Sequence, residues 1–143
     1  MNVQRMLEAK GHEVHTIRPT ASVAEAAEML TAKAIGALVV CQTGDAVIGI
    51  LSERDIVRGL TRHGADLLSM PVGSIMSTEV RTCAPEDSTS EIMALMTERR
   101  IRHLPVLRDR KLDGIISIGD VVKNRIDEVL NESEMLKNYV MGV

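Results

Sequence analysis

The chain has 143 residues, with 20 acidic and 17 basic side chains and a net charge of −3. This mild acidity argues against a nucleic-acid-binding protein, and the sequence has no Phe or Trp on which bases could stack. A composition of 45% hydrophobic residues excludes general disorder. A chain of this length buries roughly 70% of its unfolded surface, so we expect a core that needs neither a disulfide nor a structural metal.

The apolar residues are almost all aliphatic, with nine Met and a single Tyr. Cys41 and Cys83 lie in apolar runs, outside any Cys-x-x-Cys or Cys/His cluster, and are expected to be buried thiols. The N-terminus has no apolar leader segment, and no apolar stretch approaches the ~20 residues of a membrane-spanning helix. We therefore expect a cytoplasmic protein that binds neither membrane nor nucleic acid.

The first part of the chain predicts alternating helices and strands. In order these are a helix over 3–7, a strand over 13–18, a helix over 23–33, strands over 34–41 and 46–51, and a helix over 53–60. Ser22 with Glu25 has the spacing of a capping box, and Ser52 is the expected N-cap of the following helix. The continuous apolar run at 34–41 is typical of a strand that is buried on both faces.

The same plan begins again after a linker over 61–71. A short segment at 72–76 resembles 3–7, and a strand is predicted over 80–83. Ser88 with Glu91 repeats the capping-box spacing, and strands over 101–107 and 112–116 precede a helix that begins at Ser117. The apolar residues of 120–143 follow helical spacing. This tail either lies on its own domain or makes a dimer contact.

The two halves match residue by residue, which indicates an internal duplication. The pairs Pro19/Pro85, Ser22/Ser88 and Leu38/Leu104 keep one separation, and Gly49/Gly114 and Asp55/Asp120 keep a separation shorter by one residue. A lost residue in the intervening turn accounts for the change. We predict an α/β fold of two β-α-β-β-α repeats packed by pseudo-two-fold symmetry, sheets face to face. The predicted divisions are 1–60, the linker 61–71, 72–125, and a helical tail 126–143.

Each repeat ends in a Gly-h-h-Ser-x-x-Asp motif, at Gly49–Asp55 and Gly114–Asp120, where h is an aliphatic residue. The second repeat also carries Arg-His-Leu-Pro-Val at 102–106. In these features the chain resembles a tandem pair of cystathionine-β-synthase-type domains (CBS domains, or a Bateman module), over about residues 3–125. The resemblance implies a regulatory protein without catalysis, in which clefts between the repeats bind AMP, ADP, ATP, NAD or S-adenosylmethionine. It also implies a homodimer that controls an unidentified partner protein.

The resemblance places the first cleft around the first motif. Its expected lining is Ser52, Arg54, Asp55, Thr78, Val80, Ile101, Arg102, His103 and Pro105. Asp55 is expected to bind ribose hydroxyls, and Arg54 can offer a forked donor to phosphate. Because Ser-x-x-Asp is also a capping box, a purely structural role for the motif stays open.

The second cleft is expected around the second motif. Its expected lining is His12, Val14, Ile35, Gly36, Ala37, Ile115, Ser117 and Asp120. Gly119 stands where the first copy has Arg54, so this cleft is expected to be the weaker phosphate site. His12 and His15 have no evident third metal ligand. Arg99 and Arg100 are interpreted as a solvated helix end.

Three functions follow as alternatives. The first is a nucleotide-sensing regulatory module, for which AMP or ATP is the preferred ligand and NAD a further option. The second is a dimerisation or interaction domain that controls a partner without any ligand. The third is an enzyme, which no nucleophilic, metal-binding or glycine-rich phosphate-binding motif in the sequence supports.

Overall fold

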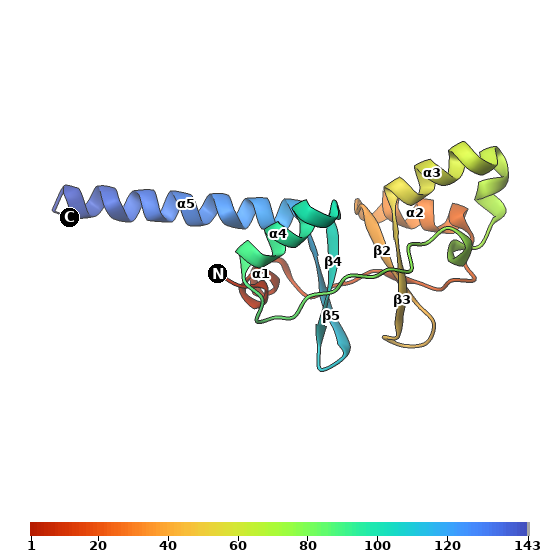
Figure 1. Cartoon of the computed structure of the whole chain (residues 1–143), viewed down its shortest axis with the longest axis horizontal. Coiled ribbons are helices and arrows are strands. Elements are labelled where there is room, and N and C mark those ends of the chain that lie inside the picture. The colour runs from red at the N-terminus through yellow and green to blue at the C-terminus, as the bar shows by residue number, and fades with distance from the viewer. Residues whose placement is uncertain (143) are drawn as a thin grey trace.

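Helices and strands alternate in the computed structural model, which describes residues 1–142, in the order expected of a duplicated unit (Figure 1). The first part consists of α1 (Val3–Lys10), β1 (Thr16–Ile17), α2 (Val23–Lys33), β2 (Ala37–Cys41), β3 (Val47–Ser52) and α3 (Glu53–His63). The short 3-10 helices η1 (Gly64–Ser69) and η2 (Val72–Ser74) follow α3. The second part consists of α4 (Thr89–Arg99), β4 (His103–Arg108), β5 (Lys111–Ser117) and α5 (Ile118–Val140).

The first sheet has the strand order β1-β2-β3, with β1 parallel and β3 antiparallel to the central strand β2. Val39 of β2 pairs with both Thr16 and Ile50. All five residues of β2 are buried, as its unbroken apolar sequence predicts. The predicted strand over 13–18 shrinks to the two residues of β1, where Ile17 alone is buried.

The second sheet contains only the antiparallel pair β4-β5, in register from His103 opposite Ser117. The predicted strand over 80–83 is wrong. In its place the chain is extended and joins β4 only at a parallel bridge between Cys83 and Val106. The Val80 amide donates to Thr78 O at 3.0 Å, and this tight turn takes the amide away from any neighbouring strand.

The two aliphatic cores exchange their covering segments. Residues Val3, Met6 and Leu7 of α1 belong to the core of the second repeat, with Ile92 and Leu104 among its members. Conversely, Val72 from η2 is buried in the core of the first repeat. Backbone bonds hold both exchanges in place, including Val3 N to Asp87 O at 2.9 Å and Val72 N to Ala21 O at 2.8 Å. The divisions proposed from sequence stay a prediction, because each core includes a segment that precedes the other repeat.

All four serines expected to cap helices do so. Ser22 and Ser88 each accept a bond from the amide three residues later, at 3.1 Å. The reciprocal bond of a full capping box is present at Ser52 and Ser117, where the third residue is Asp rather than Glu. The shorter carboxylates therefore bond the N-cap backbone and complete the two strand-to-helix turns.

Helix α5 continues well beyond the domain that it covers (Figure 1). Val121 is fully buried against the second core. Every residue from Val129 to Gly142 is exposed. The alternative in which the whole tail lies on its own domain is therefore wrong, because only the first part of α5 does so.

The exchange gives α1 a direct role in the stability of the second repeat. Leu7 has 0% exposure in that core, so Leu7→Ala is expected to lower the free energy of unfolding by about 2–5 kcal/mol. Glu8→Ala, one position along on the exposed face, is the matched control and should change it by less than about 0.5 kcal/mol. Urea titration followed by circular dichroism measures both. Equal, small effects of the two variants would contradict the packing of α1.

Candidate functional site

A cleft of ≈ 760 Å³ lies where the two repeats meet. Its walls come from β3, the start of α3, the extended segment after η2, the end of α4 and the start of β4. The residues that line it are Gly36, Ile50, Ser52, Glu53, Arg54, Asp55, Arg58, Met76, Ser77, Thr78, Glu79, Arg81, Arg99, Arg100, Ile101, Arg102 and His103. This volume is within the range of small-molecule sites in proteins.

Asp55 is the buried carboxylate of this cleft, with 8% of its surface exposed. Its Oδ2 accepts bonds from the amide and the hydroxyl of Ser52, at 2.9 and 3.2 Å. Its Oδ1 accepts a bond from Ser77 Oγ at 3.1 Å. Since an ionised carboxylate offers about four acceptor sites, these three bonds leave room for one more donor. The carboxylate is thus fixed by its own turn and still able to bind a hydroxyl.

Six arginines line the cleft, against the three acids Glu53, Asp55 and Glu79. Arg54 and Arg58 belong to α3, and Arg81 lies in the extended segment before α4. Arg99 ends α4, and Arg100 and Arg102 lie between α4 and β4. This excess of cations stands out in a chain whose net charge is −3. Guanidinium groups bind phosphate and carboxylate oxygens in pairs. The cleft can therefore hold a ligand with several negative charges.

Gly36 of the first repeat and His103 of the second lie next to each other in the cleft. A Cβ atom at Gly36 would lie 3.1 Å from Nε2 of His103, so a larger residue would press on the ring. Burial lowers the pKa of the His103 imidazole, although the neighbouring carboxylate of Glu53 opposes the shift. His103 is therefore neutral at pH 7 and can accept a proton or donate one hydrogen bond there.

The second motif has a different environment, because a lysine from α1 forms an ion pair with its carboxylate. Lys10 Nζ lies 2.5 Å from Asp120 Oδ2 and 2.7 Å from the carbonyl of Ile115. The same Oδ2 accepts the Ser117 amide at 2.9 Å. Burial alone would raise the pKa of Asp120, but the bonds from Lys10 and Ser117 outweigh it and hold that pKa below its usual range.

The other residues expected in the second cleft are spread over several environments. His12 is exposed, and its Nδ1 lies 2.9 Å from the carbonyl of Asp113. Ala37 is buried in β2 opposite Ser52, and Ile115 pairs with Pro105 in the second sheet. Val14 is half-buried ahead of β1. Ile35 and Gly36 line a separate hollow.

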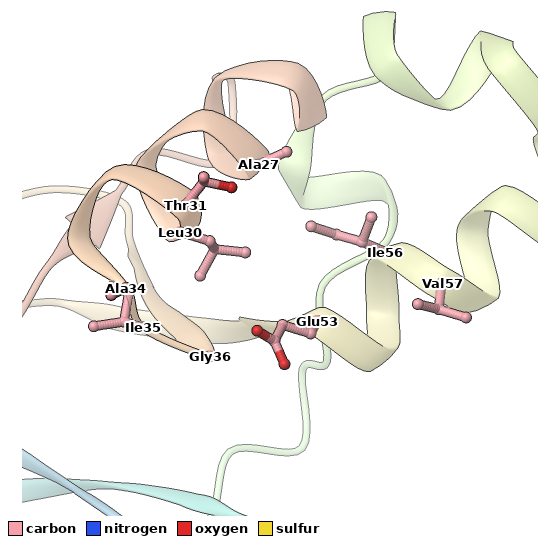
Figure 2. Close-up of a pocket in the computed structure, with 9 residues that line it drawn as sticks. All are labelled: Ala27, Leu30, Thr31, Ala34, Ile35, Gly36, Glu53, Ile56 and Val57. Atoms are coloured by element: carbon pink, nitrogen blue, oxygen red, sulfur yellow. The ribbon is translucent and has the colours of Figure 1, made fainter.

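That hollow, of ≈ 520 Å³, lies between α2 and α3 (Figure 2). Leu30 and Thr31 point into it from α2, and Ile56 points toward them from α3 (Figure 2). Glu53 is the charged member of its described lining and is shared with the larger cleft. A mainly apolar hollow with one acid is a poor site for an anion.

Most of the residues expected around the first motif line the larger cleft. Seven of its expected residues line it, namely Ser52, Arg54, Asp55, Thr78, Ile101, Arg102 and His103, whereas Val80 and Pro105 are outside the lining. Gly36, expected in the second cleft, lines the first. Four arginines were missed. Arg58 could have been found from its position one helical turn after Arg54, and Arg99 and Arg100 from their nearness to Arg102.

Residues 1–142 hold no group of three His, Cys, Asp or Glu side chains that could bind a metal ion. Cys41 and Cys83 are both buried and unpaired by a disulfide, and burial raises the pKa of Cys83 to about 12. None of the helices described is apolar over enough of its length to cross a membrane.

Two repeats, each with an antiparallel strand pair that leads into a capped strand-to-helix turn, define the class of protein. The family model for the CBS domain matches twice, at residues 10–62 and 72–127. The chain therefore belongs to the CBS-domain family. It is 39% identical over 125 residues to the mitochondrial CBS domain-containing protein CBSX3 of Arabidopsis thaliana, covering 85% of this chain but 61% of that protein. It is also 34% identical to the CBS domain-containing protein YhcV of Bacillus subtilis, with 85% and 83% covered.

Solved structures share the fold. The CBS-domain containing protein ATU1752 of Agrobacterium tumefaciens superposes with a TM-score of 0.85 at 42% identity, over 87% of this chain and 99% of that one. The CBS domain pair of protein MJ0100, solved with 5′-methylthioadenosine and S-adenosylmethionine, has a TM-score of 0.79 at 22% identity, over 90% of this chain and 98% of that one. These likenesses establish a CBS-domain pair.

The ion pair between Lys10 and Asp120 is expected to control the titration of that carboxylate. Because its pKa is lowered in the folded state, Asp120 stabilises the fold above its unfolded pKa of about 3.9, and the benefit is lost as pH falls through the folded value. Lys10→Met should raise the pKa of Asp120, measured by carboxyl NMR titration, and reduce acid stability. Arg5→Met, a change on the exposed face of α1, should leave that pKa unchanged. An unaltered titration in Lys10→Met would contradict the ion pair.

Proposed function

We propose that this protein is a regulatory module that senses an adenine nucleotide in the cleft lined by Asp55 and the six arginines. The observation that carries the proposal is the pairing of a fixed, buried carboxylate with a cation-rich wall in one cavity of ≈ 760 Å³. The carboxylate suits the hydroxyls of a ribose, and the arginines suit phosphates. The aliphatic side chains of Ile50 and Ile101 provide apolar surface for a purine.

The charge of the cleft favours a phosphate-bearing ligand. The related fold of MJ0100 was solved with two adenosine compounds, 5′-methylthioadenosine and S-adenosylmethionine. Neither compound carries a phosphate, whereas this cleft has six arginines against three acids. We therefore favour ATP over AMP and NAD, and each of these over S-adenosylmethionine, as the ligand of this chain.

The proposed mechanism is a shift between conformers and involves no catalysis. A ligand that bridges Asp55 on one repeat and Arg102 on the other binds best when the repeats are at one particular separation. It can change the population of that arrangement only by its difference in affinity for the two states. A regulated partner protein would read the change.

A ligand-independent interaction module is the second candidate. The observation that favours it is the exposed, apolar surface of α5, on which Leu136 is 65% and Val140 81% exposed. The two functions differ in their dependence on the cleft. Asp55→Asn should abolish regulation of a partner in the first case and leave it unchanged in the second.

Calorimetric titration of ATP into the protein tests the proposal directly. Arg102→Ala is expected to weaken ATP binding by roughly 10- to 100-fold, because it removes a charge-assisted hydrogen bond to phosphate. Arg5→Ala removes the same charge from an exposed position on α1 and is expected to weaken binding less than about threefold. If none of ATP, AMP, NAD or S-adenosylmethionine produces heat or a shift in Tm, the proposed function falls.

Binding should also depend on pH through His103. Its pKa is lowered in the free protein by burial, and a phosphate next to the ring would favour the imidazolium form and raise that pKa. ATP binding is therefore expected to take up protons and to tighten as pH falls toward the pKa of His103 in the complex. Titrations in two buffers of different ionisation enthalpy measure the uptake. His103→Gln should abolish it, and uptake that persists in this variant would assign the proton to another group.

A further inference from the structure

The second part of α5 has no support from the rest of the chain. The helix is 23 residues long, and every residue from Val129 to Gly142 is exposed. Isolated helices shorter than about 12–15 residues are marginal in water. Large apolar side chains on this part make its exposure costly, with Leu130 61% and Leu136 65% exposed. These facts call for a partner along α5.

The apolar residues of α5 follow a heptad pattern. A row with alternating spacings of four and three residues contains the apolar residues Val122, Ile126, Val129, Leu136 and Val140, and Ser133 between them. Ile126 and Val140 fall at the a positions and Val122, Val129 and Leu136 at the d positions. β-branched residues at a with Leu at d favour a two-stranded coiled coil, and the layers at Ile126, Leu136 and Val140 fit this rule, whereas Val122 and Val129 at d do not. Ser133 is a polar residue in the row, which lowers the stability of such a pairing without moving its register.

This apolar row faces away from the protein's own body. The residues of α5 that pack on the body include Ile118 and Val121, which contact the second core, and Asn124 and Glu128, which are half-buried. Ile126 and Val129 lie on another face of the helix. Their side chains are 53% and 48% exposed. A second helix can therefore lie along the row without meeting the domain that carries it.

We propose that the row binds α5 of a second copy of this chain, in a parallel two-stranded coiled coil. The flanking charges select this orientation. Glu132 occupies a g position and Lys137 the e position of the next heptad, and these positions meet across a parallel pair. By two-fold symmetry each pair of helices makes this contact twice.

The antiparallel arrangement is disfavoured by the same charges. With its a and d layers matched, it would place Glu132 opposite its own counterpart and Lys123 opposite Lys137 of the second copy. Like charges at these flanking positions disfavour pairing. The interface proposed for α5 is separate from the nucleotide cleft, so it does not rest on the proposed function.

Adjacent positions on α5 provide matched variants for the test. Leu136 lies in the row and Met135 beside it, and both are exposed, at 65% and 71%. The full chain is expected to sediment with twice the monomer mass of 15.6 kDa. Leu136→Glu should lose the dimer, with at least a 30-fold rise in its dissociation constant, whereas Met135→Glu should change it less than threefold. A monomeric parent protein, or a Leu136→Glu variant that stays dimeric, overturns the proposal.

Cross-linking tests the orientation independently of stability. In a parallel pair the two residues at position 136 face each other, within the Cα separation of about 4.4–6.8 Å that a disulfide requires. Leu136→Cys should form a disulfide dimer under mild oxidation, and Met135→Cys should form much less. Cys41 and Cys83 are buried and do not compete. If Leu136→Cys fails to cross-link while the protein is dimeric, the α5 pairing is wrong.

Discussion

The structure depends on the exchange of two short segments between two small cores. Neither core contains a Phe or Trp, so each gains its burial from many aliphatic side chains of modest size. Helix α1 supplies Leu7 to the second core, and η2 supplies Val72 to the first. Each repeat therefore lacks part of its own covering and obtains it from a segment that precedes the other. The cleft therefore lies between two repeats, and the core of each repeat needs a segment from outside that repeat.

The same exchange makes the two motifs unequal. Both Ser-x-x-Asp turns form full capping boxes, so the backbone geometry of the two sites is alike. One difference lies within the motifs, where Gly119 stands in place of Arg54, and a second comes from outside the turns. α1 ends next to Asp120 and places Lys10 on its carboxylate, whereas Asp55 faces the hydroxyl of Ser77 and a wall of arginines. One turn is closed by an internal cation, and the other faces a cleft.

Most of the fold could be predicted from the sequence because the duplication repeats the pattern of nearly every element. Helix α2 has the predicted bounds, and the buried strand β2 lies within its apolar run. The prediction of a strand over 80–83 was wrong because alternation of apolar and polar residues does not reveal local backbone hydrogen bonds. Here the Val80 amide bonds to Thr78 O and is not available to a neighbouring strand. Lys10 was missed for a different reason. It is one residue among many on an exposed helix face, and only the packing of α1 on a distant part of the chain brings it to Asp120. Similarly, Arg99 and Arg100 fit a helix end equally well, and their place in the cleft comes from the contact between the repeats.

The position of Lys10 has a consequence for how a duplicated protein diversifies. Duplication produces two equal turns, and a change of the Ser or the Asp in one of them would remove a bond of its capping box. Lys10 lies outside both repeated motifs, on helix α1, which packs in the core of the second repeat. Lys10, at the end of α1, therefore adds to the difference that Arg54 and Gly119 already make within the motifs, while both turns keep their structure. The N-terminal helix, which belongs to neither motif, thus supplies the cation that pairs with the Asp120 carboxylate, whereas Asp55 has no such internal partner among the described contacts.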